Sequence, residues 1–469
     1  MFTYPKNVKS IHTFEFMGDK FVYDVNSISF FKVDELAWDI LELAGDYSSF
    51  AITEKLKKKY PKREIARTFQ EFEKLEREGE LFSREEPPIL KEKIPWSNMV
   101  LQIAHDCDLR CKYCFAGHGR YKGARLLMDE KTGERAVDFF LEESHGVDDL
   151  TLSFFGGEPL LNMKLIEHLV PYAKTAAKKH GKSFKKIIVV TNGVKLEDRV
   201  VRYLDEAEII LKVSLDGPPE VHDPIRPLPD GRGSHQLIRA GLERMKGTDL
   251  MNRTTLRATY CGQSTELSKI FSYLMETGFR LFEVEPAYLS PRNRYAIRKK
   301  HIPELKDELG KMGKLYIEAL STENPPIFHS LEFVLRRIAS GVHKFNECAA
   351  GEGSFTISAD GGIYPCFELD GNETYRMGDI FKGVNAGTRD IWLATRYLDS
   401  RPGCEECWAR YICGGGCRAR AIRFKGDMLR PFEIECEMKK LYFELAMWIM
   451  SKAGKGGDDT ACLGFLPEA

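Results

Sequence analysis

The sequence predicts an α/β protein in which a parallel sheet is joined to a small N-terminal α+β module and a cysteine-rich C-terminal region. Three observations support this prediction. Strand-like and helical stretches alternate from about residue 96 to residue 320, as in parallel sheets with helical crossovers. Three short alternating stretches and then three helical ones occupy residues 1–86. Seven cysteines lie between Cys348 and Cys436, in a spacing that core packing would not impose.

Composition and charge indicate a globular protein and argue against a nucleic-acid-binding, membrane or secreted one. Hydrophobic residues make up 43% of the 469 residues, enough for a large packed core. The 69 Lys and Arg residues nearly balance the 70 Asp and Glu residues, so no overall field favours nucleic acid or an anionic membrane. The N-terminus lacks the apolar core of a signal peptide, and the longest apolar tract, LYFELAMWIM, is too short to span a bilayer. We expect a cytoplasmic protein without nucleic-acid or membrane partners.

Residues 1–86 are predicted to form a separate module. The stretches IHTFEF, KFVYDV and SISFFKV alternate apolar and polar residues as short strands do. Three helical stretches follow, the first starting at Asp34 and the last closed by Gly79. This order indicates a winged-helix-like topology. The basic run KLKKKYPKR fits DNA binding, although it equally fits a solvated helix face, and the linker REEPPILKEKIPW ends the module.

The central region, residues 96–320, contains six predicted strands separated by helical stretches. The strands are NMVLQIAH, DLTLSFFGGEP, KKIIVVTNG, IILKVSLDG, TTLRATY and RLFEVEPA. Ligand sites on parallel sheets lie at the carboxyl ends of the strands. The polar and glycine residues there are therefore candidate ligand contacts, although each also suits an ordinary turn: Gly156, Gly157, Glu158, Thr191, Asn192, Ser214, Asp216 and Arg257.

The first strand leads into a loop, HDCDLRCKYCFA (residues 105–116, the cluster loop), with the cysteine spacing C-x-x-x-C-x-x-C. Thiolates at Cys107, Cys111 and Cys114 can hold three irons of a [4Fe–4S] cluster and leave the fourth iron for a small chelating molecule. A structural zinc site takes four ligands. From the motif alone, a zinc site that lacks one ligand and reduced thiols in a core remain alternatives.

The cluster loop resembles the motif of the radical S-adenosylmethionine (radical SAM) superfamily, whose open iron binds the amino and carboxylate groups of SAM. The resemblance implies a partial (β/α)6 TIM-like barrel over residues 96–320 and a SAM cofactor. It also implies SAM contacts at the strand ends. These are Glu158, with Gly156 and Gly157, for the amino group, Thr191 and Asn192 for the ribose, Ser214, Asp216 and Arg257 for the carboxylate and sugar, and Tyr113 and Phe115 for the adenine.

The polar segment VHDPIRPLPDGRGSH, residues 221–235, has two interpretations. Its charges and glycines suit an active-site loop over a substrate. They suit a surface connector equally well.

The seven C-terminal cysteines resemble the signature of SPASM domains, which carry two auxiliary [4Fe–4S] clusters; zinc is the alternative, because paired C-x-x-C motifs also build zinc ribbons. The resemblance places the domain at residues 348–440, after a bridging region (321–347) and before a C-terminal helix and tail (441–469). It implies that the distal cluster is bound by Cys404, Cys407, Cys413 and Cys436, and the proximal cluster by Cys348, Cys366 and Cys417. One proximal iron would then stay open, unless His343 or Glu347 supplies a fourth ligand.

The N-terminal module resembles the RiPP recognition element, which binds the leader of a ribosomally made peptide as an added strand. Anaerobic sulfatase maturases carry an aspartate directly after the second SPASM cysteine, where this chain has Phe367. The stretches FFGGEPLLN, YPCFELDGNETYRMGDIF and PFEIECEMKK are similar to thioether-forming maturases of the ranthipeptide type, which act on peptides with six cysteines in forty-five residues.

This resemblance implies a radical SAM oxidoreductase that joins a cysteine sulfur to a carbon of a precursor peptide. A 5′-deoxyadenosyl radical would abstract hydrogen from the peptide, and a substrate thiolate held on the proximal cluster would attack the carbon. A reductant such as flavodoxin or ferredoxin would supply electrons. The alternatives are carbon–carbon or carbon–oxygen cross-linking, epimerisation, maturation of a quinone cofactor, and a protein that binds clusters without catalysis. Beyond the cluster ligands, the sequence assigns no catalytic residue.

Overall fold

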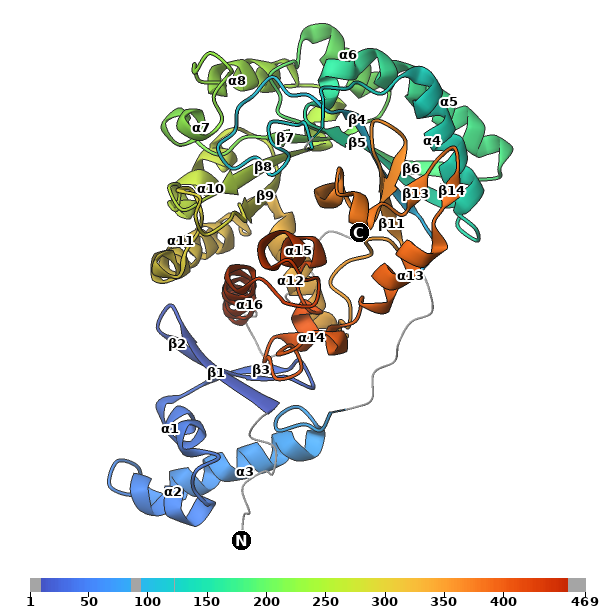
Figure 1. Cartoon of the computed structure of the whole chain (residues 1–469). Helices are drawn as coiled ribbons and strands as arrows, with labels where there is room; N and C mark the ends of the chain where they lie inside the picture. The colour runs from blue at the N-terminus through green and yellow to red at the C-terminus, as the bar shows by residue number, and fades with distance from the viewer. Residues whose placement is uncertain (1–9, 86–93, 122, 454–469) are drawn as a thin grey trace.

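An eleven-stranded sheet runs through most of the chain, in the order β10-β9-β8-β7-β6-β5-β4-β11-β12-β13-β14 (Figure 1). The structure is a computed structural model, and it describes residues 10–85, 94–121 and 123–453. The start of the predicted module, most of the linker and the C-terminal tail with Cys462 lie outside these residues. The parallel strands are β4 (Asn98–Ala104), β5 (Asp149–Gly156), β6 (Ser183–Thr191), β7 (Ile210–Ser214), β8 (Thr254–Tyr260), β9 (Leu281–Pro286) and β10 (Ile327–Phe328).

Helices surround the outer side of the curved sheet (Figure 1). Each follows a strand in the chain, so the six predicted strand–helix units and the partial barrel are confirmed. The helices are α4 (Glu130–Glu143), α5 (Met163–Lys179), α6 (Asp198–Glu206), α7 (Pro219–Ile225), α8 (His235–Arg244), α9 (Asp249–Asn252), α10 (Leu267–Glu276) and α11 (Ile302–Ala319), with short 3₁₀ turns η2 (Pro159–Asn162) and η3 (Lys299–His301).

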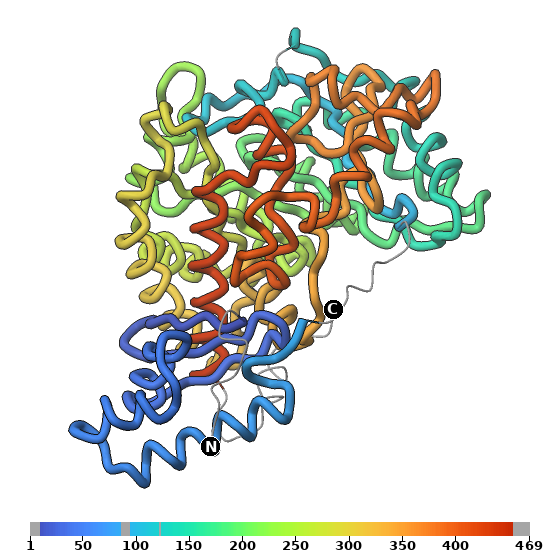
Figure 2. Tube along the Cα trace, turned by 60° about the horizontal axis from the view of Figure 1, so that its bottom comes forward, coloured from blue at the N-terminus to red at the C-terminus, as the bar shows by residue number. Residues whose placement is uncertain are grey.

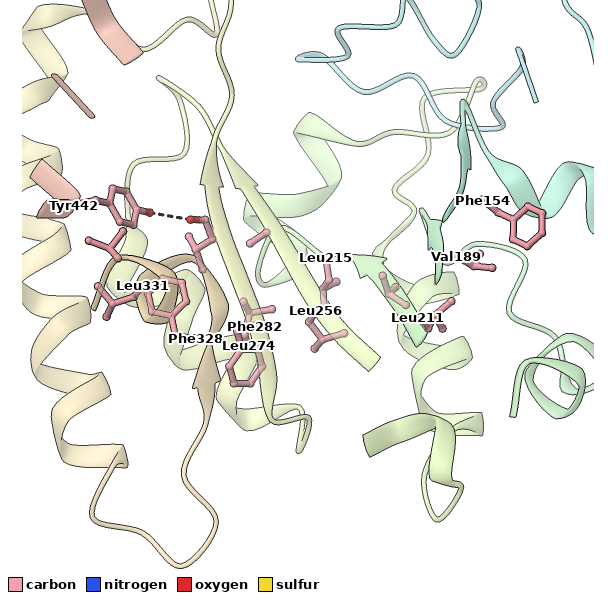
Figure 3. Packing of buried hydrophobic residues seen from close by; sticks show 14 of the residues in the cluster. Phe154, Val189, Leu211, Leu215, Leu256, Leu274, Phe282, Phe328, Leu331 and Tyr442 are labelled. Carbon is pink, nitrogen blue, oxygen red and sulfur yellow. Dashed lines mark hydrogen bonds between the residues drawn. The ribbon is translucent and has the colours of Figure 1, made fainter. Parts of the chain in front are cut away.

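The barrel core forms because alternate strand residues face the helices. In β5, Leu150, Leu152 and Phe154 are fully buried, while the residues between them face the opposite side. Neighbouring strands add further buried side chains to the same layer, such as Val189 and Leu211 (Figure 3). Each such side chain contributes about 1.5–3 kcal/mol to folding, so the barrel is a rigid platform for its loops.

The N-terminal module has the predicted three strands and three helices. Asp34 caps the first helix, accepting a hydrogen bond from Ala37 N–H (2.8 Å), and Gly79 ends the last helix at φ 75°. Figure 2 shows the module at one end of the molecule, beside the C-terminal helix. Its elements are β1 (Ile11–Phe16), β2 (Asp19–Asp24), β3 (Phe30–Val33), α1 (Glu35–Leu43), α2 (Ser49–Leu56) and α3 (Lys62–Glu78).

The cysteine-rich region continues the barrel sheet, which the sequence did not predict. Strand β11 pairs in parallel with β4 and supplies hydrogen-bond partners for the edge of the open barrel; β12 to β14 then add antiparallel strands. The elements are α12 (His329–Ser340), β11 (Ser354–Ile357), β12 (Gly362–Tyr364), η4 (Phe367–Leu369), η5 (Glu373–Tyr375), β13 (Gly378–Asp379), β14 (Gly383–Val384), α13 (Ala386–Ala394), η6 (Leu398–Ser400), α14 (Arg410–Cys413), α15 (Arg418–Lys425) and α16 (Glu433–Ala453).

Helix α16 crosses the domain boundary predicted at residue 440. It begins at Glu433, and Cys436 lies in its first turn. The charged first turns hide the start of the helix in the sequence, because the apolar run begins only at Leu441, although Glu435 and Met438 are already buried. None of the helices in the described ranges has the length and apolarity needed to cross a membrane.

Candidate functional site

The cluster loop directly follows β4 and reaches the carboxyl end of β6. The Cys107 Sγ accepts a hydrogen bond from Leu109 N–H (3.4 Å) and lies 3.7 Å from Asn192 Nδ2. The Cys114 Sγ accepts from His118 N–H (3.3 Å). Donors aimed at sulfur stabilise thiolate ligands and tune the potential of a cluster.

The chemistry of these thiols fits a metal cluster. Burial raises the pKa of Cys107 above its ordinary range and that of Cys111 to about 11. Thiolates at these positions therefore need a positive partner, which iron supplies. No group of three His, Cys, Asp or Glu side chains in the part of the chain that the structure describes could hold a single metal ion.

The glycines of FFGGEP allow this turn to approach the cluster loop. A Cβ on Gly156 would lie 2.4 Å from Ala104 O, and one on Gly157 would lie 2.1 Å from Asp106 O. The backbone hydrogen bonds from Gly157 N–H to Ala104 O (2.7 Å) and from Glu158 N–H to Asp106 O (2.8 Å) hold the contact. The close approach predicted for these glycines is therefore one between two loops of the protein.

Glu158 is fully buried, and its carboxylate accepts hydrogen bonds from the protein itself. It accepts hydrogen bonds from Leu160 N–H (2.9 Å), the Thr191 hydroxyl (2.7 Å) and Asn192 N–H (2.7 Å). Burial and then nearby Asp108 raise its pKa to about 7. The geometry thus makes Glu158 a brace between two strand ends, and its contact with the amino group of SAM stays a prediction.

Tyr113 and Asp216 form a buried network below the cluster loop, together with Arg226. The Tyr113 hydroxyl donates to Asp216 Oδ2 (2.6 Å) and accepts from Arg226 Nη1, and Thr259 N–H donates to Asp216 Oδ1 (3.0 Å). Arg226 Nη1 lies 3.9 Å from Asp216 Oδ1, with side chains 7% and 2% exposed. Burial raises the pKa of Asp216 although Arg226 opposes the shift. The sequence suggested that Asp216 contacts SAM, whereas here its carboxylate ties the cluster loop to β7 and β8.

The segment at residues 221–235 anchors the cluster loop. Lys112 N–H donates to Ile225 O and Arg110 N–H donates to Pro227 O, both at 2.8 Å. The segment is thus attached to the cluster loop through its backbone, and its two interpretations, as an active-site loop or as a surface connector, stay predictions. Sequence reasoning missed Arg226, whose only visible signal was an arginine between two prolines in IRPLP.

The other predicted contacts gather at the same end of the barrel. Ser214 and Arg257 lie opposite each other in β7 and β8. Arg257 Nε lies 3.5 Å from Glu283 Oε2, so a carboxylate already faces its guanidinium. Phe115 packs against Phe367 with ring centroids 5.8 Å apart. Their contacts with SAM stay predictions.

The four cysteines predicted for the distal cluster lie close enough to influence one another's charge. Burial, then Cys413, Glu435, Cys404 and Cys407, raise the pKa of Cys436 to about 12. Burial and then Cys413 raise that of Cys404 to about 11. Helix α14 supplies Cys413, and α16 supplies Cys436. The grouping fits four ligands of one cluster.

The three cysteines predicted for the proximal cluster also lie together. Burial, then Glu368 and Cys348, raise the pKa of Cys366 to about 12. Burial, then Glu368 and more weakly Cys348, also raise the pKa of Cys417. Both candidate fourth ligands are engaged elsewhere: Glu347 with Lys344 and Lys439, and His343 with Asn26 O and the Tyr411 ring.

The loop CGGGC between the two groups requires glycine. Gly414 has φ 74°, and a Cβ there would lie 2.8 Å from the backbone carbon of Asn346. Gly416 has φ 73°, but nothing lies within 4 Å of its Cβ position. An alanine at either position would be strained by the left-handed backbone, but only an alanine at position 414 would also clash with the backbone of Asn346.

Gly414→Ala is expected to lower the iron bound by the distal cysteines, because it adds a backbone clash to about 1–2 kcal/mol of left-handed strain. Gly416→Ala, the matched control, adds the strain alone. Iron content and the electron paramagnetic resonance (EPR) signal after reconstitution would measure the effect. Equal losses in the two variants would contradict this account.

The N-terminal module contacts the loop that carries the distal ligands. The His12 ring stacks on the ring of Trp408, with centroids 3.9 Å apart. Trp408 lies between Cys407 and Cys413 in the chain. Arg410 Nη2 donates to Asn26 Oδ1 (2.8 Å). The module is thus fixed to the cysteine-rich region.

A cavity of about 570 Å³ lies between the cluster loop and the segment after Cys366. His105 Nε2 lies 2.9 Å from Asp370 Oδ2 and joins the two segments near the cavity. Arg423 donates to Phe115 O (3.2 Å) and lies 3.9 Å from Glu368. The cavity is therefore lined by residues that neighbour Cys114 and Cys366 in the chain.

Comparisons with known proteins agree with this architecture. The model of the radical SAM superfamily matches residues 101–266, and that of the SPASM iron–sulfur cluster-binding domain matches residues 348–409. A cysteine-type anaerobic sulfatase-maturating enzyme of Clostridium perfringens is 24% identical over 373 residues, which cover 75% of this chain and 96% of the relative. The radical SAM cyclopropyl synthase TigE of Paramaledivibacter caminithermalis is 23% identical over 364 residues, which cover 73% of this chain and 72% of the relative.

Two solved structures show the same fold. The sulfatase maturase anSMEcpe with bound AdoMet and Kp18Cys peptide has a TM-score of 0.64 at 20% identity, covering 76% of this chain and 99% of that chain. Streptococcus suis SuiB bound to precursor peptide SuiA has a TM-score of 0.51 at 17% identity, covering 90% and 97%. The chain thus contains a radical SAM domain and a SPASM domain, and domains of these two kinds bind [4Fe–4S] clusters and S-adenosylmethionine.

Proposed function

We propose that this radical SAM SPASM-type maturase installs thioether cross-links, from a cysteine sulfur to a carbon, in a ribosomally made precursor peptide. The observation that carries the proposal is the cavity of about 570 Å³. Phe115 and Ala116, next to the last cysteine of the cluster loop, line one part of it, and Glu368 and Asp370, just after Cys366, line another. A peptide side chain in this cavity would lie against residues that follow the last cysteine of the cluster loop and residues that follow the proximal cysteine Cys366.

When bound, SAM and the clusters supply a radical that removes hydrogen and an acceptor for the remaining electron. The chain's own residues position the peptide and exclude water. Phe367 packs against Phe155, with ring centroids 4.8 Å apart, and against Phe115. An aromatic side chain thus occupies the position directly after the second SPASM cysteine, where sulfatase maturases carry an aspartate. This difference supports a reaction other than sulfatase maturation. A substrate thiolate could occupy the iron that the three proximal cysteines leave free.

The leader of the peptide would bind the N-terminal module. In the described residues β3 pairs with β2 alone, so its other edge can accept an added strand. The named relatives support a peptide substrate, because SuiB was solved with precursor peptide SuiA and anSMEcpe with a peptide named Kp18Cys. The contact between His12 and Trp408 would hold the module at a fixed distance from the clusters.

The test uses the reconstituted full chain, SAM, a reductant, and a short cysteine-rich peptide encoded beside the gene. We expect 5′-deoxyadenosine and a peptide that is lighter by two hydrogens for each cross-link. Tandem mass spectrometry would locate each link at a cysteine. A peptide without its leader should react far more slowly, because it must bind through the cavity alone.

Other outcomes separate the alternatives. The same mass loss in a peptide whose cysteines are all serine would reject thioether formation and favour carbon–carbon or carbon–oxygen bonds. Deoxyadenosine formed with an unchanged peptide mass would indicate epimerisation. An absence of SAM cleavage under reducing conditions would indicate a protein that binds clusters without catalysis.

A further inference from the structure

A second cavity, of about 280 Å³, lies between the barrel and the SPASM domain, beside the distal cysteine Cys413. Helix α12, strand β9 and helix α16 contribute to its wall, so it is separate from the cavity proposed for the peptide. Its lining includes four basic side chains next to one distal ligand: Arg337, Lys344, Arg420 and Lys439. The site therefore concentrates positive charge beside a group that carries negative charge when it binds iron.

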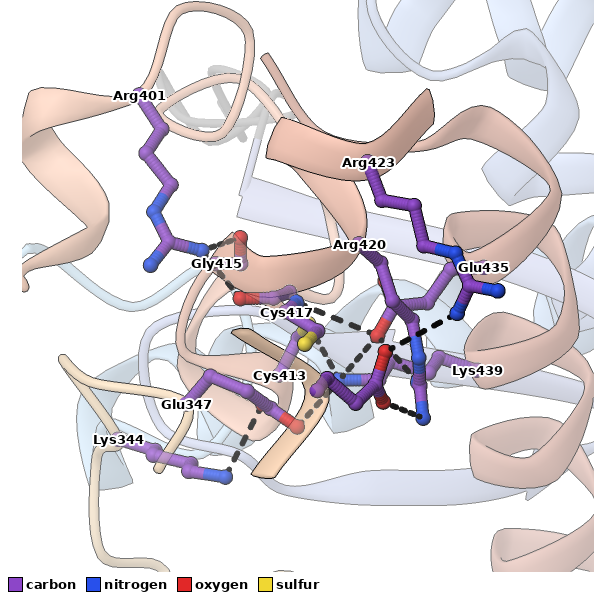
Figure 4. Close-up of polar contacts among 12 residues, drawn as sticks. Lys344, Glu347, Arg401, Cys413, Gly415, Cys417, Arg420, Arg423, Glu435 and Lys439 are labelled. Carbon is purple, nitrogen blue, oxygen red and sulfur yellow. Dashed lines mark hydrogen bonds and ion pairs between the residues drawn. The ribbon is translucent and has the colours of Figure 1, made fainter. Parts of the chain in front are cut away.

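Among these basic residues, Lys439 contacts the thiol of Cys413. Its Nζ lies 4.0 Å from Cys413 Sγ (Figure 4). Its ammonium also pairs with Glu347 and lies 3.5 Å from Glu435 Oε1. The side chain is 18% exposed and that of Glu435 is 2% exposed, so water screens these charges weakly.

Two carboxylates fix the ammonium in this position. Glu347 binds Lys439 on one side and Lys344 on the other (3.1 Å). Glu435 also accepts hydrogen bonds from Arg420 Nη1 (3.1 Å) and from the backbone N–H of Cys417 (3.2 Å), a proximal ligand. Lys439 therefore lies between the two groups of cysteines. Its ammonium contacts the distal ligand Cys413, and its partner Glu435 contacts the proximal ligand Cys417.

We propose that Lys439 is a positioning residue for electron transfer, which raises the reduction potential of the distal cluster through its ammonium group beside Cys413. One-electron reduction adds one negative charge to a cluster and its thiolates. A fixed cation at this distance stabilises the reduced form more than the oxidised form. If the thioether reaction occurs, the electron left by the substrate-derived radical would pass to the bound clusters and then to a one-electron carrier of the flavodoxin or ferredoxin class.

The test measures midpoint potentials by EPR-monitored redox titration of the reconstituted full chain. Cys107, Cys111 and Cys114 are replaced by alanine in every sample, so that only the auxiliary clusters contribute signals. Lys439→Met removes the cation and should shift one auxiliary potential to more negative values. Glu347→Gln removes the opposing anion and should shift the same potential to more positive values.

Two further variants control for structural effects. Lys439→Arg keeps the charge and should restore a potential close to that of the parent. Lys440→Met changes the next residue, whose ammonium pairs with Glu437 (3.5 Å) near the surface, and should shift nothing. A distorted site would move both charge variants in one direction, whereas the proposal requires opposite directions.

The proposal is wrong if Lys439→Met leaves both auxiliary potentials unchanged, or if both charge variants shift in the same direction. If Lys439→Met does not take up iron, the Glu347→Gln variant alone tests the proposal: a shift to more positive potential supports it, and no shift or a negative shift contradicts it. The result does not depend on which bond the enzyme forms, so a failure here and a failure of the thioether proposal remain distinguishable.

Discussion

Cys111→Ala is expected to abolish the cleavage of SAM while leaving the auxiliary clusters in place. The cluster loop offers three thiols, and removing one leaves two ligands for a cluster that needs three. The distal and proximal clusters would be bound by cysteines outside the cluster loop, so this substitution leaves their ligands in place. Deoxyadenosine production should fall to the level without enzyme, and iron content should fall by the amount of one cluster, measured after anaerobic reconstitution.

Cys261→Ala is the matched control for this variant. Cys261 is fully buried in the same barrel, and its Sγ lies 3.4 Å from the Ser264 hydroxyl, away from both auxiliary groups. It should retain its clusters and SAM cleavage with a modest loss of stability. Substantial deoxyadenosine formation by Cys111→Ala would show that this thiol is not a ligand.

The strands and the motif of the cluster loop could be recognised in the sequence because each depends on local spacing. The alternation in DLTLSFFG sets which residues of β5 are buried, and the close spacing from Cys107 to Cys114 limits what three thiols can bind. Asp34 and Gly79 likewise mark helix ends through contacts with their own neighbours in the chain. Such signals need no knowledge of the tertiary structure.

The missed features all depend on pairs that are distant in sequence. Strand β11 completes β4 across about 250 residues, and Arg226 meets Tyr113 across 113 residues. The carboxylate of Glu158 accepts hydrogen bonds from two donors at the end of β6, which the sequence pattern did not reveal. Sequence patterns identify polar groups at strand ends, whereas the partner of each group depends on how neighbouring loops pack.

Asp216→Asn is expected to destabilise the chain without clusters by about 3 kcal/mol, because it leaves the Arg226 guanidinium buried without its counter-charge. The change keeps the shape of the side chain, so the loss comes from charge and from the hydrogen bonds of Tyr113 and Thr259. Urea denaturation under anaerobic conditions would measure it. Because this network holds the cluster loop, iron bound at Cys107, Cys111 and Cys114 should fall as well.

A double variant separates the charge effect from a general loss of packing. Arg226→Met combined with Asp216→Asn replaces the buried ion pair by neutral groups, and it should recover much of the stability lost in Asp216→Asn alone. Asp230→Asn is the matched control on the same segment, since its pair with Arg232 (2.7 Å) is exposed and worth at most about 1 kcal/mol. If Asp216→Asn costs no more than Asp230→Asn, Arg226 draws its compensation from elsewhere. The cluster loop would then be held by its backbone contacts with Ile225 and Pro227.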